Sequence, residues 1–210
     1  ILVTSTSETY GTAQFVPISE EHPLVGQSPY SASKIGADQL AISYYKSFNM
    51  PIKIVRPFNT YGPRQSARAI IPTIVSQLMN NKNKIKLGSL SPTRDLTFVE
   101  DTCDGFYEIY NSNSLFGDTT NIGMNSEISI GDLVMLISEL MKIEVKVEKK
   151  KERIRPKSSE VERLVCNNSK ILKETSWNPK YTLAEGINKF IEWMKNPKNL
   201  KLYKSEQYNV

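Results

Sequence analysis

Residues 28–58, SPYSASKIGADQLAISYYKSFNMPIKIVRPF, decide the fold. Their first part, 28–49, predicts one long helix, because Ser28 is a good N-cap and Pro29 suits the first helical position. The part that follows, 52–58, predicts a short buried strand of a parallel sheet. A long helix that leads directly into a buried strand is typical of an α/β protein.

The sequence before this helix predicts another strand. Residues 1–3 form a continuous apolar run that we expect to be buried on both faces, and a polar loop (12–27) follows it. Strand, loop, long helix and strand are the order of a parallel α/β sheet. A doubly covered strand needs neighbours on each side, so we expect the chain to be the C-terminal part of a longer protein.

The sequence after residue 58 predicts a mixture of short strands and amphipathic helices. One of these helices is expected to begin with Asp101 as its cap, and the last with Thr182. The predicted helices are 69–80, 99–111, 129–142 and 182–196, and the predicted strands are 85–88, 119–123 and 145–148.

The composition is that of a globular protein, with 39% hydrophobic and 23% charged residues. No stretch approaches the roughly 20 apolar residues that a membrane span needs, and no signal peptide is visible. Cys103 and Cys166 lie far apart, with no Cys or His at metal-ligand spacing. We therefore expect a cytoplasmic location, no metal and no membrane partner.

The net charge of +5 is concentrated in VEKKKERIRPK, residues 147–157. Acidic residues are interleaved elsewhere, and the aromatic-plus-basic pattern of an RNA-recognition surface is missing from the sequence. We interpret 147–157 as a solvated loop and expect no nucleic-acid partner.

Tyr30 and Lys34 are four residues apart and share one face of the predicted helix. A free phenol titrates near ~10, so a tyrosine can act as a base at neutral pH only beside a cation such as a lysine ammonium. Glu8 follows the first predicted strand, and Asn59 follows the next one. Because ligands bind at the carboxyl ends of parallel strands, these side chains predict a site at that edge of the sheet.

The sequence resembles the extended short-chain dehydrogenase/reductase family, in its NAD-dependent nucleotide-sugar epimerase/dehydratase branch. The resemblance covers nearly the whole chain and is closest to the sugar-nucleotide 4,6-dehydratases, in particular that of legionaminic-acid biosynthesis. Four ordered motifs carry it: STSETYG (5–11), SPYSASK (28–34), RPFNTYGPRQ (56–65) and PTRDLTFVEDTCDGF (92–106).

The resemblance implies an α/β fold of two parts. Residues 1–66 would be the C-terminal part of a Rossmann-type doubly wound parallel sheet that binds NAD. Residues 67–210 would mainly form a small mixed α/β substrate lobe, interleaved with the last Rossmann elements. The family's Gly-rich turn for the dinucleotide pyrophosphate is missing from this sequence. We therefore expect the isolated chain to be inactive.

The resemblance also implies catalytic roles. Tyr30 would take the proton of the sugar C4 hydroxyl while hydride passes from C4 to NAD⁺. Lys34 would lower the tyrosine pKa and hold the nicotinamide ribose, and Thr6 would hydrogen-bond the C4 oxygen. Glu8 would then remove the C5 proton, and Ser7 would assist the loss of water from C6. The product would be a 4-keto-6-deoxy sugar nucleotide.

The remaining site residues are expected to bind the cofactor and the nucleotide sugar. By resemblance, Pro57 shapes the nicotinamide pocket and Asn59 reaches the substrate. Arg94 and Arg155 match positions that contact the diphosphate or the ribose. Arg68 lies where the substrate loop enters its helix.

The resemblance further implies a homodimer through the long helix 28–49. It favours an N-acetylglucosamine nucleotide as substrate and leaves UDP and GDP open. A UDP-glucuronate decarboxylase stays an alternative, because its pattern also places Ser-Glu at positions 7 and 8. A 4-epimerase is less favoured, since it has no step that needs a base at C5. A non-catalytic nucleotide-sugar-binding protein is the alternative of another class.

Overall fold

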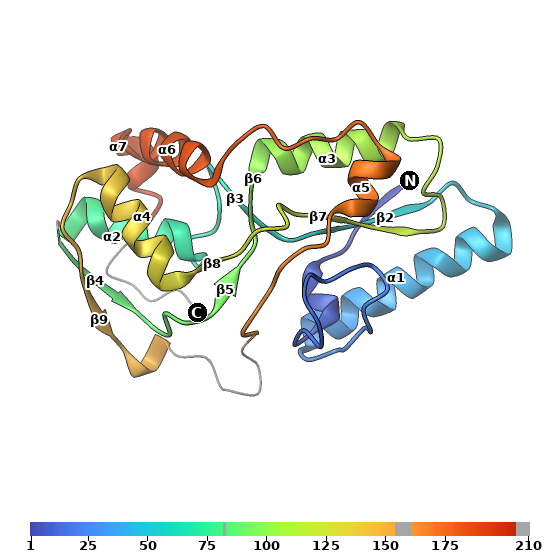
Figure 1. The fold of residues 1–210 in the computed structure, drawn as a ribbon, viewed down its shortest axis with the longest axis horizontal. Coiled ribbons are helices and arrows are strands. Elements are labelled where there is room, and N and C mark those ends of the chain that lie inside the picture. Colours follow the sequence, from blue (N-terminus) through green and yellow to red (C-terminus); the bar gives the residue numbers. More distant parts are fainter. Residues whose placement is uncertain (82, 154–160, 205–210) are drawn as a thin grey trace. The chain divides into compact units, whose positions relative to one another are not determined.

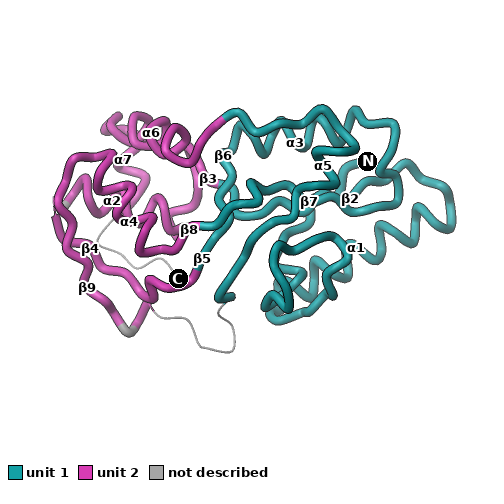
Figure 2. The backbone as a smooth tube through the Cα atoms, in the orientation of Figure 1, with its two compact units in different colours: residues 1–60, 93–127, 158–180 teal, residues 61–92, 128–157, 181–210 magenta. Residues whose placement is uncertain are grey.

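The computed structural model describes residues 1–81, 83–153 and 161–204. The chain divides into two compact units, each assembled from segments that are far apart in sequence (Figure 2). Unit 1 contains residues 1–60, 93–127 and 158–180, and unit 2 contains residues 61–92, 128–157 and 181–210.

Unit 1 is built on a three-stranded parallel sheet in the order β1-β2-β7. The strands are β1 (Leu2–Thr4), β2 (Lys53–Pro57) and β7 (Thr119–Ile122). This arrangement confirms the α/β class and the parallel sheet that the sequence predicted.

Helices cover both faces of this sheet (Figure 1). On one face, Ile54 of β2 packs with Ala41 of α1 (Pro29–Phe48). On the other face, Val55 packs with residues of α3 (Val99–Asn111) and α5 (Ser169–Glu174). Consecutive strand residues thus both enter a core, as expected for a strand that is buried on both faces.

Helix α1 begins and ends close to where the sequence predicted. The Ser28 hydroxyl accepts the Ser31 N–H at 3.1 Å, and the Ser28 N–H donates to the Ser31 hydroxyl at 2.9 Å. These reciprocal bonds form a capping box. At the other end, Asn49 adopts the left-handed conformation with φ 55° and stops the helix.

Strand β1 is only partly buried within the described residues, where it lies at the edge of the sheet and pairs with β2 alone. One sequence expectation about unit 1 is wrong. Asp101 does not cap α3, whose N-cap is Phe98. Asp101 lies buried inside the first turn of the helix, where its carboxylate accepts the N–H of Lys180 at 2.8 Å.

Unit 2 packs helices against a two-stranded parallel sheet of β4 and β9. Its last long helix, α6, starts at Thr182 with the predicted cap, a reciprocal capping box with Glu185. The bounds in this unit are α2 (Ile70–Asn81), β4 (Lys84–Leu87), α4 (Ile130–Met141), β9 (Lys146–Lys149), η2 (Lys151–Arg153), α6 (Leu183–Met194) and α7 (Pro197–Leu200). The remaining elements are η1 (Ser7–Tyr10), β3 (Asn59–Tyr61), β5 (Thr93–Arg94), β6 (Leu96–Phe98) and β8 (Ile128–Ser129).

Within residues 1–81, 83–153 and 161–204, no helix combines the length and the apolar character that crossing a bilayer requires.

Candidate active site

The chain turns sharply at the carboxyl end of β1. The Ser5 N–H still donates to the carbonyl of Val55 at 2.8 Å and so extends the sheet by one residue. The Thr6 side chain then caps the short 3₁₀ helix η1, because its Oγ1 accepts the N–H of Glu8 at 3.2 Å. This turn places Thr6, Ser7 and Glu8 at the edge where parallel sheets bind ligands.

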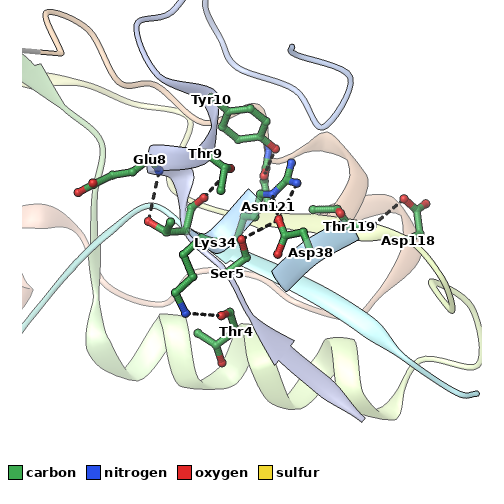
Figure 3. A network of polar contacts seen from close by, with 12 residues as sticks. Thr4, Ser5, Glu8, Thr9, Tyr10, Lys34, Asp38, Asp118, Thr119 and Asn121 are labelled. Atoms are coloured by element: carbon green, nitrogen blue, oxygen red, sulfur yellow. Dashed lines mark hydrogen bonds and ion pairs between the residues drawn. The ribbon is translucent and has the colours of Figure 1, made fainter. Parts of the chain in front are cut away.

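Ser7 and Glu8 are neighbours in the chain but face different environments. The Ser7 side chain is buried, whereas Glu8 is exposed. Figure 3 shows the Glu8 carboxylate pointing away from the buried carboxylate of Asp38. The turn therefore leaves the Glu8 carboxylate at the surface and keeps the adjacent hydroxyl inside the protein.

Lys34 connects α1 to the same strand end. Its Nζ donates to the carbonyl oxygen of Thr4 at 3.0 Å (Figure 3). One turn earlier on the helix, the Tyr30 side chain is half exposed, and its hydroxyl has no hydrogen-bond partner among the residues that the structure describes. The structure thus brings Lys34 to the segment that carries Thr6 and Glu8, and it leaves the Tyr30 phenol available to a ligand.

The second strand end contributes an amide. Pro57 is the last residue of β2, and Asn59 is the first residue of β3. The Nδ2 atom of Asn59 is buried and has no hydrogen-bond partner in the described part of the chain. A buried donor without a partner costs about 1–3 kcal/mol, so this amide is suited to an acceptor on a ligand.

The three arginines predicted to bind the substrate lie in different parts of the chain. The Arg94 Nη1 donates to the carbonyl oxygens of Thr93 at 2.7 Å and of Val161 at 2.8 Å, so part of its guanidinium is engaged by the backbone. Arg68 is exposed and lies in unit 2, just before α2. Arg155 lies outside the described residues.

Sequence reasoning missed a buried ion pair behind these side chains. Arg56 of β2 is 3% exposed, and its Nη2 lies 2.8 Å from Oδ2 of Asp38, which is fully buried on α1. Two signals could have revealed it. Arg56 is a charge inside an apolar strand and so requires a partner, and Asp38 follows Lys34 by four residues on the same helix face.

Tyr10, also missed, completes this buried cluster. Its ring lies below the Arg56 guanidinium, 4.9 Å from Cζ to the ring centroid, and its hydroxyl donates to Oδ1 of Asn121 at 2.7 Å. Burial raises the pKa of Tyr10 to about 12, although the Arg56 charge opposes this shift. Tyr10 is therefore a neutral hydrogen-bond donor at ordinary pH, unlike a catalytic tyrosine.

Comparison with known proteins assigns the family. The sequence profile described as GDP-mannose 4,6 dehydratase matches residues 1–190. The dTDP-D-glucose 4,6-dehydratase of Homo sapiens is 30% identical over 192 residues, which are 90% of this chain and 54% of that protein. A putative UDP-glucose 4-epimerase of Methanocaldococcus jannaschii is 27% identical, over 93% of this chain and 63% of that protein.

A solved structure gives the same result for the fold. The dTDP-glucose 4,6-dehydratase of Bacillus anthracis in complex with NAD is 31% identical, with a TM-score of 0.82 over 98% of this chain and 64% of that chain. This chain spans about half the length of the curated dehydratases that it matches, 54% and 56% for two of them. The match over residues 1–190 confirms the resemblance carried by the four motifs: the chain belongs to the GDP-mannose 4,6-dehydratase family, within the extended short-chain dehydrogenase/reductases of the NAD-dependent epimerase/dehydratase type.

Proposed function

We propose that the full-length protein containing this chain is an NAD-dependent nucleotide-sugar 4,6-dehydratase that forms a 4-keto-6-deoxy sugar nucleotide. The observation that carries the proposal is Glu8, an exposed carboxylate two residues from Thr6 at the strand end that Lys34 contacts. A dehydratase needs a base for the C5 proton, whereas a 4-epimerase has no such step.

The residues present fit the cofactor of this family. Tyr30, Lys34 and Pro57 would hold NAD, which when bound supplies a hydride acceptor for C4. The Tyr30 hydroxyl is free of hydrogen bonds within the described residues, as a group that serves a ligand should be. The buried Nδ2 of Asn59 lacks an acceptor there, which fits a substrate oxygen.

The proton transfers follow from the hydrogen bonds around Thr6. Because Thr6 Oγ1 already accepts the Glu8 N–H, its own proton is available to the sugar C4 oxygen. Tyr30 takes the proton of the C4 hydroxyl. Once C4 is a carbonyl, the C5 hydrogen is acidic because its loss gives an enolate, and Glu8 removes that hydrogen.

Ser7 has a smaller part in this proposal. Its side chain is only 3% exposed, so it would assist departure of the C6 hydroxyl indirectly, by orienting the turn between Thr6 and Glu8. A hydroxyl is a weak acid, and we therefore expect its removal to cost far less activity than removal of the Glu8 carboxylate.

The proposed substrate is an N-acetylglucosamine nucleotide with UDP or GDP as the nucleotide. Arg68, Arg94 and Arg155 would bind its diphosphate or ribose, since arginine forms paired hydrogen bonds with phosphate. A dTDP-glucose substrate is the second candidate, because dehydratases of that name are 30% and 31% identical to this chain.

We further propose a homodimer that forms through α1. Leu40, Tyr44 and Phe48 follow one another at four-residue spacing and are 61%, 44% and 69% exposed. Such a stripe of large apolar side chains on one helix face is typical of an association surface.

Cys103 and Cys166 are both free thiols, which fits the cytoplasmic location that we propose.

The test is mass spectrometry of the full-length protein incubated with NAD⁺ and a panel of UDP-, GDP- and dTDP-sugars. Loss of one water from the substrate, abolished by Glu8→Gln and retained by the exposed control Glu21→Gln, supports the dehydratase. Loss of carbon dioxide from UDP-glucuronate would instead identify a decarboxylase. A change of C4 configuration without loss of mass, detected by NMR, would identify an epimerase, and binding without any conversion would favour a non-catalytic protein.

A further inference from the structure

The ion pair of Asp38 and Arg56 lies between the two halves of the candidate site. We propose that this pair is a positioning device, which fixes the helix that carries Tyr30 and Lys34 against the turn that carries Thr6 and Glu8. Its effect on turnover rests on the proposed function, but its effect on the structure of the site does not.

Three donors converge on one oxygen of Asp38. Arg56 donates to Oδ2 through Nη2 at 2.8 Å and Nε at 3.1 Å. The Ser5 hydroxyl donates to the same atom at 2.8 Å, and Figure 3 shows Ser5 beside Asp38. The other oxygen, Oδ1, is buried without a hydrogen-bond partner among the described residues. These contacts join α1, the end of β1 and β2 at a single atom.

Asp38 and Lys34 together fix α1 in two directions. They lie one helical turn apart and bind two consecutive residues at the end of the first strand. Lys34 donates to the carbonyl of Thr4, and Asp38 accepts from the hydroxyl of Ser5. Two bonds one turn apart oppose both sliding and rotation of the helix along the strand. The next residue of that strand end is Thr6.

Arg56 extends the same constraint to the turn that bears Glu8. Its guanidinium lies over the ring of Tyr10, the last residue of η1, and Tyr10 is fixed in turn by its bond to Asn121 of β7. One side chain therefore contacts the helix of the candidate base Tyr30 and the turn of the candidate base Glu8. A shift of Arg56 would move the two relative to each other.

Stability alone is a weak reason for such a pair. Replacement of a buried ion pair by apolar residues of similar volume is often neutral or stabilising, whereas loss of one partner leaves a buried unpaired charge and is strongly destabilising. The double variant Asp38→Leu/Arg56→Met therefore separates stability from positioning. It can restore stability without restoring the hydrogen bond of Asp38 with Ser5 or the cation–π contact of Arg56 with Tyr10.

The experiment compares Asp38→Asn, the double variant and a matched control in the full-length protein. The control is Lys53→Met, which removes another buried cation of β2; its Nζ donates to the carbonyl of Ile109, a residue of α3, at 2.8 Å. Urea unfolding, kcat, KM and amide hydrogen exchange of residues 4–10 and 29–38 are measured for each protein.

We expect Asp38→Asn to lower kcat by about 10²-fold, the typical cost of a reacting group displaced by about 1 Å. KM should change little. The double variant should recover stability, yet keep the low kcat and show faster exchange than wild type in both segments. Lys53→Met should lose stability while its kcat and the exchange of residues 4–10 stay at wild-type values.

A double variant that regains wild-type kcat and wild-type exchange would overturn the proposal and leave the pair as core packing. If the double variant does not fold, the Ser5→Ala variant tests the proposal instead. Wild-type hydrogen exchange of residues 4–10 and 29–38 in Ser5→Ala would also overturn the proposal. If the wild-type protein converts no sugar nucleotide, the proposed function fails, but the exchange rates still test the positioning device.

Discussion

At the residue scale, the contrast between Ser7 and Glu8 has a kinetic consequence. The carboxylate is exposed at the strand end and the hydroxyl is buried. Since a general base typically contributes about 10²–10⁴-fold, Glu8→Gln should lower kcat by that factor, while Ser7→Ala should lower it by roughly tenfold or less. Steady-state kinetics of the full-length protein give both values. An equal loss in the two variants would contradict the assignment of Glu8 as the C5 base.

Asn59 offers a test of substrate contact that is separate from stability. Because its buried Nδ2 has no partner within the described residues, Asn59→Ala removes an unsatisfied donor and should leave the free energy of unfolding nearly unchanged. The variant should bind the sugar nucleotide about tenfold more weakly, the equivalent of one ordinary hydrogen bond of about 1.4 kcal/mol. Urea unfolding and calorimetric titration measure the two quantities. A stability loss with unchanged affinity would show that the amide is structural.

Asp95 makes stability depend on pH. Burial raises its pKa from 3.8 to about 6, even though the N–H groups of Met124 and Cys166 donate to its oxygens. Between these two values the folded chain binds more protons than the unfolded chain, so the free energy of unfolding falls as the pH rises from about 4 to about 6. The decrease should total about 3 kcal/mol and stop above the folded pKa.

The measurement is urea unfolding at intervals from pH 4 to pH 7, for the wild type and Asp95→Asn. The variant also replaces one of two acceptor oxygens, so only the change with pH is compared. As the carboxyl ionises, the free energy of unfolding of the wild type should fall relative to that of Asp95→Asn. Curves that run parallel over the whole range would contradict an elevated pKa for Asp95.

At the scale of elements, the structure agrees with the sequence where the signal is local. Ser28 and Thr182 cap α1 and α6 as predicted. A capping box involves only four consecutive residues, so a local sequence pattern is enough to predict the cap. Asp101 was misassigned as a cap because its partner, the Lys180 N–H, lies 79 residues away. Helix spacing predicts that Tyr30 and Lys34 share one face of α1. The contact of Lys34 with Thr4 and the pairing of Asp38 with Arg56 depend on contacts between separate elements, which spacing does not reveal.

Helix α1 also carries the prediction on assembly. Two charges in its apolar stripe, Leu40→Glu and Phe48→Glu, should convert a dimer to a monomer, because like charges would face each other at a desolvated surface. The control Lys46→Glu changes the charge of an exposed residue outside the stripe. Light scattering of the full-length protein gives the mass. A wild-type monomer, or a dimer that survives both substitutions, would refute the proposed interface.

At the scale of the whole molecule, the order of segments along the chain does not predict which segments pack together in one unit. Unit 1 combines three segments separated by up to 32 residues of unit 2, and no local pattern predicts that combination. Hydrophobic periodicity does predict single helices and strands, because it indicates which face of one element is buried. It does not indicate which other element covers that face. The assignment of residues 1–66 to the cofactor and mainly 67–210 to the substrate therefore stays a prediction, which depends on ligands rather than on packing.

The last prediction concerns the 210 residues as an isolated chain. None of their 10 glycines forms the Gly-x-Gly-x-x-Gly turn, whose backbone N–H groups approach a dinucleotide pyrophosphate. The chain also spans 54% of the human dehydratase to which it is similar. We therefore expect the isolated chain to convert no sugar nucleotide in the presence of NAD⁺, while the full-length protein does. Mass spectrometry of equal concentrations of the two proteins measures this, with circular dichroism to establish that the isolated chain is folded. Turnover by the isolated chain would contradict the prediction. It would show that these residues suffice both for catalysis and for binding NAD⁺.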